Sequence, residues 1–171
     1  RRLEAEAIRD SVLAVAGTLN FEAGGPGYSA FEPNENYVRV YTPRERFESP
    51  QWRRMVYMTK VRMERDAVFG AFDSPDAAQV CPRRTQSTTP LQALNLLNST
   101  FITDQAEHFA ARLRTESGDD PADQVQRAFL LTTGREPEAE ETAAAVQLIE
   151  EHSLQAFCRV AFNLNEFLFL P

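Results

Sequence analysis

From residue 89 onward the chain consists of amphipathic stretches, each preceded by a residue that starts helices. Thr89-Pro90-Leu91-Gln92 is a capping box, in which each end residue can bond the backbone N–H of the other through its side chain. Pro90 occupies the first helical position, where its missing N–H costs nothing. Further helix starts are predicted at Ser99, Asp120, Pro137 and Ser153. The last of these five helices is apolar on almost every side, which is typical of a central helix.

The first half of the chain mixes helical and irregular stretches. Residues 2–16 have apolar side chains at helical spacing and predict a helix that ends at Gly17. Residues 51–68 predict a second helix, which is the most basic element of the chain. Glycines and prolines interrupt the chain at about residues 20–50 and 70–88.

Only residues 37–41 alternate in the manner of a short strand. The patterns therefore predict one mostly α-helical domain spanning residues 1–171, with about six or seven helices. It has a long irregular loop region and at most one short strand or hairpin. Loops of this length in a compact domain usually bind something or lean on a neighbouring domain.

The chain of 171 residues carries a net charge of −7, and this charge is unevenly spread. Residues 1–100 hold 13 Lys and Arg against 12 Asp and Glu, a balance of +1, whereas residues 101–171 hold 5 against 13, a balance of −8. An acidic half argues against nucleic acid and anionic membranes as partners, because both attract cationic surfaces. No apolar run is long enough to insert into a bilayer.

No catalytic, cofactor or metal site is predicted. Two cysteines, Cys81 and Cys158, and two histidines do not form a zinc pattern. Cys158 is expected to pack as a small apolar side chain, and a disulfide to Cys81 stays open. His108 follows Asp104 by four residues, and we favour a surface ion pair over a general base. Gly24-Gly25-Pro26-Gly27 lacks the lysine of a phosphate loop and favours a tight turn over an anion site.

The more informative feature is a supply of arginines beside the irregular stretches. Guanidinium groups next to aromatic rings suit a protein interface or an anionic ligand such as a carboxylate or sulfate. The alternative, which the sequence favours about equally, is that several of them bond loop carbonyls and internal carboxylates. The candidate partner-binding or anion-binding surface consists of Arg39, Trp52, Arg53, Arg54, Arg62, Arg83 and Arg84.

The chain enters a helical pattern directly at Arg1, and we expect it to be a piece of a longer protein. Several segments resemble, in order, a planctomycete-specific domain of unknown function. They are residues 2–10, 24–26, 89–98, Gly134-Arg135-Glu136-Pro137 and Asn165-Glu166-Phe167-Leu168-Phe169.

The resemblance implies the C-terminal part of a large exported protein, after a cytochrome-c-like region and a second domain of unknown function. It implies an extracytoplasmic location, and it supplies no catalytic residues. The covalent haem motif is missing here, so no cofactor is expected in this fragment.

The first functional hypothesis is a non-catalytic interaction or scaffold module that docks on upstream domains of the same chain or on another exported protein. The alternatives are an enzyme domain acting on a sulfated or carboxylated polysaccharide, with the arginines binding this anionic glycan, and an accessory part of a haem electron-transfer protein.

Overall fold

The structure, a computed structural model, describes residues 1–33, 37, 40–62, 64, 66, 68–75 and 77–170. These residues form seven α-helices and three short 3₁₀ turns, which confirms the predicted mostly α-helical fold. The α-helices are α1 (Ala5–Ala16), α2 (Pro90–Asn98), α3 (Thr100–Ser117), α4 (Pro121–Thr132), α5 (Ala139–Glu151), α6 (Leu154–Ala161) and α7 (Asn165–Leu168). The turns are η1 (Ser49–Gln51), η2 (Met55–Tyr57) and η3 (Phe69–Phe72).

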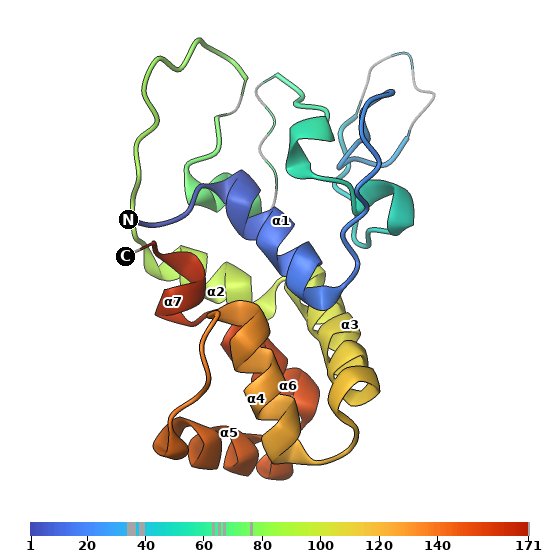
Figure 1. The fold of residues 1–171 in the computed structure, drawn as a ribbon. Helices are drawn as coiled ribbons and strands as arrows, with labels where there is room; N and C mark the ends of the chain where they lie inside the picture. The colour runs from blue at the N-terminus through green and yellow to red at the C-terminus, as the bar shows by residue number, and fades with distance from the viewer. Residues whose placement is uncertain are drawn as a thin grey trace.

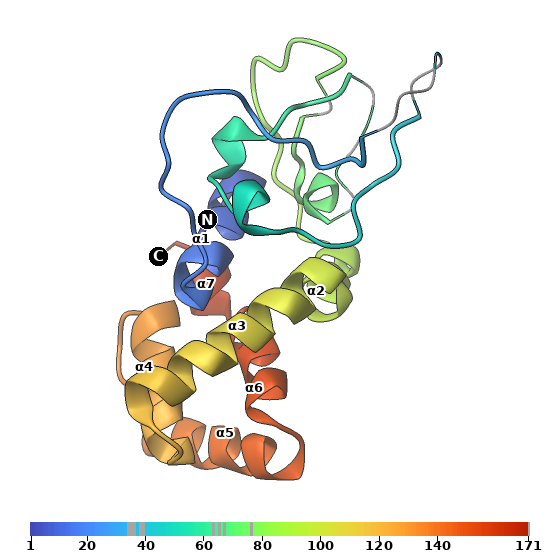
Figure 2. The ribbon, with the colours of Figure 1, turned by 90° about the vertical axis from the view of Figure 1, so that its right-hand side faces the viewer.

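Helix α1 lies between two differently built lobes (Figure 1). On one side it contacts α3, which belongs to a helical lobe made by α3, α4, α5 and α6. On its other side it contacts η2 and η3, which belong to an irregular lobe formed by the chain between α1 and α2. A view turned by 90° shows the same separation (Figure 2). The position of α1 means that its polar residues face the loops while its apolar residues face the bundle.

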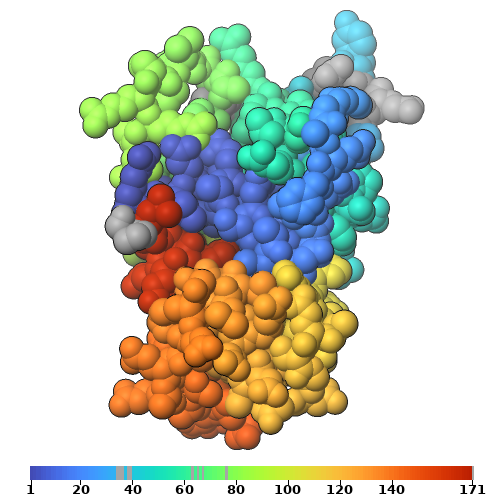
Figure 3. Space-filling model, viewed as in Figure 1, coloured from blue at the N-terminus to red at the C-terminus, as the bar shows by residue number. Residues whose placement is uncertain are grey.

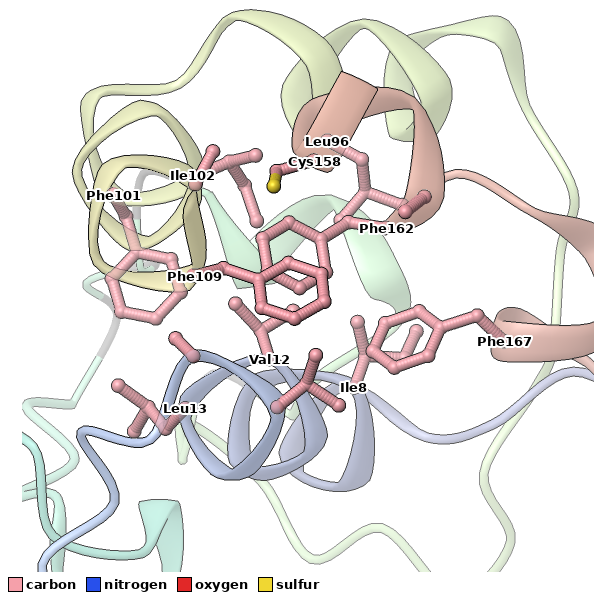
Figure 4. Close-up of a cluster of buried hydrophobic side chains, with 14 of the residues drawn as sticks. Ile8, Val12, Leu13, Leu96, Phe101, Ile102, Phe109, Cys158, Phe162 and Phe167 are labelled. Carbon is pink, nitrogen blue, oxygen red and sulfur yellow. The ribbon is translucent and has the colours of Figure 1, made fainter. Parts of the chain in front are cut away.

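The apolar core joins α1 to the helical lobe (Figure 4). Ile8 and Val12 of α1 are fully buried and point toward the rings that α3 and the end of α6 contribute. Phe109 and Phe162 stack with ring centroids 5.5 Å apart. Helix α6 contacts α2, α3, α4 and α5, which agrees with the central place predicted from its apolar sequence. Each fully buried side chain of this size stabilises the fold by about 1.5–3 kcal/mol.

Four of the five predicted helix starts are found at the expected residues, whereas α5 begins at Ala139 with Glu138 as its cap and not at the predicted Pro137. Thr89 and Gln92 form the capping box, and the Thr89 N–H donates to Gln92 Oε1 at 3.2 Å. The side chains of Ser99, Asp120 and Ser153 each accept a backbone N–H from the first turn of their helix. These local signals hold because each cap satisfies a backbone donor that the helix itself leaves unpaired.

The last helix was predicted as one element, and this is wrong. Helix α6 ends at Ala161, and α7 begins at Asn165. The Asn163 side chain donates to the carbonyls of Leu96 and Arg159, both at 3.0 Å. An asparagine that bonds the backbone in this way competes with the helical hydrogen bonds. The break turns Phe167 back onto the core, where its ring lies 5.7 Å from that of Phe162.

The helix predicted over residues 51–68 is also wrong, because in the described part of this stretch only η2 and the last residue of η1 are helical turns. The chain here runs beside the segment that follows α1. The Asn20 N–H donates to the Trp52 carbonyl at 3.1 Å, and the Tyr28 N–H donates to the Tyr57 carbonyl at 3.0 Å. The backbone groups that a helix would use are therefore bonded to another part of the chain.

Two polar side chains of α1, those of Arg9 and Asp10, bond the backbone groups that would otherwise form helical hydrogen bonds in residues 51–55. In a helix the Gln51 carbonyl would accept from the Met55 N–H. Instead that carbonyl accepts from Arg9 Nη2 at 2.6 Å, and the Met55 N–H donates to Asp10 Oδ1 at 2.7 Å. Arg9 Nη1 also bonds the Arg53 carbonyl at 2.8 Å. The tertiary contacts thus override a helical pattern in the local sequence.

The strand predicted at residues 37–41 lies partly outside the described residues, since Val38 and Arg39 belong to the undescribed ones. The described residues contain isolated β-bridges and no strand longer than one residue. One bridge pairs Arg2 with Phe169, so the two ends of the chain lie side by side. The Arg1 amino group donates to the Leu170 carbonyl at 2.8 Å, and the Leu170 N–H donates back to the Arg1 carbonyl at 2.8 Å.

Arg135, in the connection between α4 and α5, contacts residues of α4, α5 and α7. Arg135 donates to both carboxylate oxygens of Glu141 at 2.7 Å and to the carboxylate of Glu166 at 3.0 and 3.1 Å. Its guanidinium also lies over the ring of Phe129. Hydrogen bonds from Arg135, assisted by the Glu138 N–H, lower the pKa of Glu141 from 4.5 to about 2. The interaction therefore ties α5 and α7 to the end of α4.

Replacing Arg135 with glutamine is expected to raise the pKa of Glu141 from about 2 toward 4.5, because the charged donor is lost. In the wild type the interaction is fully present above pH 4.5 and is lost as the pH falls through about 2. NMR titration of the Glu141 carboxyl carbon measures this shift. Arg127→Gln is the matched control, since Arg127 pairs with Glu116. An unchanged Glu141 titration in Arg135→Gln would contradict the assignment.

Candidate interaction surface

Arg53, one of the predicted surface residues, lies inside the irregular lobe with only 6% of its surface exposed. Its guanidinium donates to the carbonyls of Glu22 at 3.2 Å, Pro26 at 2.8 Å and Gly24. The predicted tight turn at the glycines is present, with Gly24 and Gly25 at positive φ. The turn presents carbonyl oxygens to an internal cation, which is the reverse of an anion-binding loop. Arg53 is thus a structural residue, as the alternative interpretation of the arginines expected.

Trp52 is half-buried and packs against the helical lobe. Its ring meets the ring of His108 on α3 edge-on, with centroids 5.1 Å apart. His108 therefore has an aromatic neighbour, and the described contacts contain no ion pair between it and Asp104. Trp52 joins the irregular lobe to α3 rather than presenting its whole ring to a partner.

The other predicted arginines in the described part of the chain are exposed. Arg54 contacts Asp10 on α1 at 3.3 Å, and Arg62 donates to the Ala78 carbonyl at 3.4 Å. Arg84 bonds the carboxylates of Glu6 in α1 and of Glu4, the residue before α1, whereas Arg83 is exposed. Arg39 lies outside the described residues. The structure thus brings Arg62, Arg83 and Arg84 to one feature, the loop between η3 and α2.

This loop, residues 73–87, is closed at its base and is called the arch below. At the base, the Ser87 N–H donates to Asp73 Oδ2 at 2.8 Å, and the Ser87 hydroxyl donates to Asp73 Oδ1 at 2.9 Å. Arg2 donates to the same carboxylate at 2.7 Å, and the Gln92 side chain donates to the Ser87 carbonyl at 3.2 Å. Compact surface loops with joined ends are frequently functional.

The middle of the arch stands away from the body of the molecule (Figure 3). Val80 is 93% exposed, and Cys81, Pro82 and Arg83 beside it are exposed as well. Among the described residues, Arg84 makes the ion pairs that link this part to the N-terminal end of the chain. Arg84 Nη1 donates to Glu6 at 2.8 Å and to Glu4 at 3.0 Å. The arch therefore presents an exposed apolar residue, Val80, and an exposed arginine, Arg83, on a loop with a fixed base.

A cleft of about 430 Å³ opens between the arch, α1 and η2. Its floor is apolar, because Met55 and Met58 are buried there and Val56 lies at its side. Among the described residues, two carboxylates and two cations line it, and their formal charges cancel. The lining residues are Glu4, Glu6, Met55, Val56, Met58, Lys60, Pro75, Ala77 and Arg84.

Lys60 is a charged residue of the cleft whose pKa is lowered by its surroundings. Its ammonium donates to the Ser74 hydroxyl of the arch at 3.0 Å. Partial burial lowers the pKa of Lys60, and the nearby carboxylates of Asp66 and Glu6 oppose this. Arg84 differs, because the hydrogen bond that it donates to Glu6 raises the pKa of its guanidinium. Both cations of the cleft thus already have partners within the domain.

Sequence reasoning missed several residues of this surface. Glu4 and Glu6 read as the polar side of a helix, and their link to Arg84 spans about 80 residues of chain with no local signal. Lys60 was likewise read as part of a basic helix. The base of the arch was detectable, since Asp73-Ser74-Pro75 is a sequence that favours the start of a turn.

The cysteines lie in different environments. Cys158 is buried in the core, where burial raises the pKa of its thiol, and Cys81 is an exposed free thiol on the arch. Cys158 packs as a small apolar residue, as predicted. Within the described residues no group of three or more His, Cys, Asp or Glu side chains is arranged to hold a metal ion. None of the described helices combines the length and apolar character needed to cross a bilayer.

The fold and the surface define a small helical domain whose loops are braced by internal arginines and expose a neutral cleft beneath an arch. The chain belongs to the family described as PSD1, protein of unknown function (DUF1553), whose sequence model matches residues 1–149. Comparison with curated proteins and with solved structures gives no match. The family assignment agrees with the resemblance to a domain of unknown function noted in the sequence.

Replacing Arg84 with alanine is expected to release the middle of the arch while leaving the fold intact. The lost ion pairs are exposed, so the free energy of unfolding should fall by at most about 1 kcal/mol. Backbone ¹⁵N order parameters at residues 83–86 should fall, and the helical circular dichroism should not change. Arg83→Ala is the matched control, because the Arg83 guanidinium bonds no carboxylate of the described residues. Equal order parameters of the arch in both variants would show that Arg84 does not hold it.

Proposed function

We propose that this domain is a non-catalytic interaction module of a larger extracytoplasmic protein, and that it docks on an upstream domain of its own chain. The arch is the observation that carries this proposal. It exposes Val80 almost completely, and Arg83 beside it has a charge that no carboxylate of the described residues neutralises. Arginine is enriched at the energetic centres of protein interfaces, and an exposed apolar side chain beside it offers surface that a partner can bury.

The cleft under the arch supports protein docking over glycan binding. A sulfated or carboxylated polysaccharide needs a surplus of positive charge. Here Glu4 and Glu6 offset Arg84 and Lys60, and the floor is made of methionines. Such a site suits an apolar side chain of a partner domain, with a carboxylate of that partner placed against Arg83.

The resemblance described above supports the choice of partner and of location. It relates the chain to domains that follow other domains in large exported proteins. The base of the arch also supports docking, because a loop whose ends are fixed loses less conformational entropy when it binds. A fixed loop is what a permanent contact between domains of one protein requires.

The proposal is tested by titrating this domain with the separately expressed upstream region of its parent protein. Saturable binding is expected. The substitutions Val80→Asp and Arg83→Glu should each weaken it at least about tenfold, which is about 1.4 kcal/mol. The first removes an apolar contact, and the second places a negative charge against the expected carboxylate of the partner. Isothermal titration calorimetry measures these affinities.

Arg114→Glu is the control for charge, since Arg114 is exposed on α3 in the helical lobe. It should bind like the wild type. The proposal fails if the wild-type domain does not bind, or if both arch variants bind as tightly as Arg114→Glu.

A further inference from the structure

A second candidate site lies in the helical lobe, between α4, α5 and α6. Figure 1 shows how these three helices are arranged. It is a groove of about 230 Å³ with almost entirely apolar walls. Glu141 is the one charged residue among those that line it. The lining residues are Phe129, Glu141, Ala144, Ala145, Leu148, Phe157, Val160, Ala161 and Leu164.

The groove exists because α5 presents small side chains to its neighbours. Ala144 and Ala145 line one wall, where a larger residue would fill the space. On the opposite wall Val160 remains 40% exposed. Protein interiors are usually packed to the density of organic crystals, so an open apolar groove of this size is an unfilled surface feature. It is suited to receive large apolar side chains from another molecule.

The charges around the groove indicate what kind of molecule fits. Residues 101–171 carry 13 acidic and 5 basic side chains. Most of these arginines are already bonded, Arg135 to Glu141 and Glu166, and Arg112 and Arg127 to Glu116. Glu140 and Glu151 on α5 are exposed at the edge of the groove, because they lie four residues before Ala144 and three residues after Leu148, and no arginine of the described residues pairs with them. The surroundings of the groove therefore attract cations.

We infer that the groove between α4, α5 and α6 binds a basic amphipathic helix of a partner protein, which inserts large apolar side chains between lysines or arginines. Helices commonly bind in this way, with apolar residues three or four positions apart entering a groove formed by other helices. The acidic rim favours a basic partner, because complementary charges increase the association rate and disfavour partners of the same charge. This site is independent of the arch, since no residue is shared between them.

The test uses two designed helical peptides with the same leucine pattern, one with lysines and one with glutamates at the polar positions. The lysine peptide should bind saturably, with NMR shift changes at Ala144, Leu148 and Val160. The glutamate peptide should bind at least tenfold more weakly. Ala144→Phe should reduce affinity for the lysine peptide at least tenfold, because the added ring fills the groove. Ala143→Phe is the matched control, since Ala143 is exposed on the same helix and does not line the groove.

Val160→Ser provides a second variant that removes a wall of the groove without adding volume, and it should also weaken binding. Equal binding of both peptides would indicate a purely apolar site, such as one for acyl chains, and would overturn the inference. It would also be overturned if the lysine peptide did not bind, or if Ala143→Phe weakened binding as much as Ala144→Phe.

Discussion

The irregular lobe depends on one buried group, the guanidinium of Arg9. This side chain is 2% exposed, yet it lies between the rings of Tyr28 and Phe101 and bonds the carbonyls of Gln51 and Arg53. Asp10 follows it and accepts the Met55 N–H while lying 3.7 Å from Arg9. Burial lowers the pKa of Arg9, and the carboxylate of Asp10 opposes this. A charge in such a place is tolerated only because these acceptors surround it.

The consequence is a loop region that is fixed without regular secondary structure. Arg9 and Asp10 hold the chain near η2, and Arg53 in turn holds the glycine turn through its carbonyls. Arg2 stabilises the base of the arch by donating a hydrogen bond to Asp73. The buried arginines of this half, Arg2, Arg9 and Arg53, therefore brace the loops, whereas Arg83 and Arg84 are exposed on the arch. The arch is thus attached to a fixed support.

The two proposed binding surfaces lie at opposite ends of the molecule (Figure 1). The arch and its cleft belong to the irregular lobe, and the apolar groove belongs to the helical lobe, with α1 between them. A domain built in this way is suited to join two neighbours, one through a neutral cleft and one through an acidic groove. This arrangement fits a module that holds parts of a larger assembly together.

Local chemistry explains which parts of this fold could be predicted. The caps at Thr89, Ser99 and Ser153 act within one helical turn, so the sequence predicts α2, α3 and the start of α6 directly. The break at Asn163 and the missing helix after Trp52 depend on partners far away in the chain. The expected number of helices is right because these two errors compensate.

In the candidate surface, too, local features could be predicted from the sequence, whereas contacts between distant residues could not. The sequence identified the arginines as unusual and left open whether they bind a partner or the protein's own backbone. Arg53 bonds the backbone, and Arg83 faces solvent, although both were predicted from one pattern. Glu4 and Glu6 were not predicted at all, because an ion pair across about 80 residues leaves no periodic signal.

The most direct test of this account replaces Arg9 with methionine, which keeps the length of the side chain and removes its charge and donors. The account predicts a fall of about 3–5 kcal/mol in the free energy of unfolding, because the carbonyls of Gln51 and Arg53 lose their donor and Asp10 loses the charge beside it. Amide exchange at Met55 and Tyr28 should accelerate more than exchange in α3. Arg46→Met, at an exposed position of the same lobe, should change stability by no more than about 0.5 kcal/mol. If Arg9→Met were as stable as this control and kept its protection at Met55, the irregular lobe would not depend on Arg9.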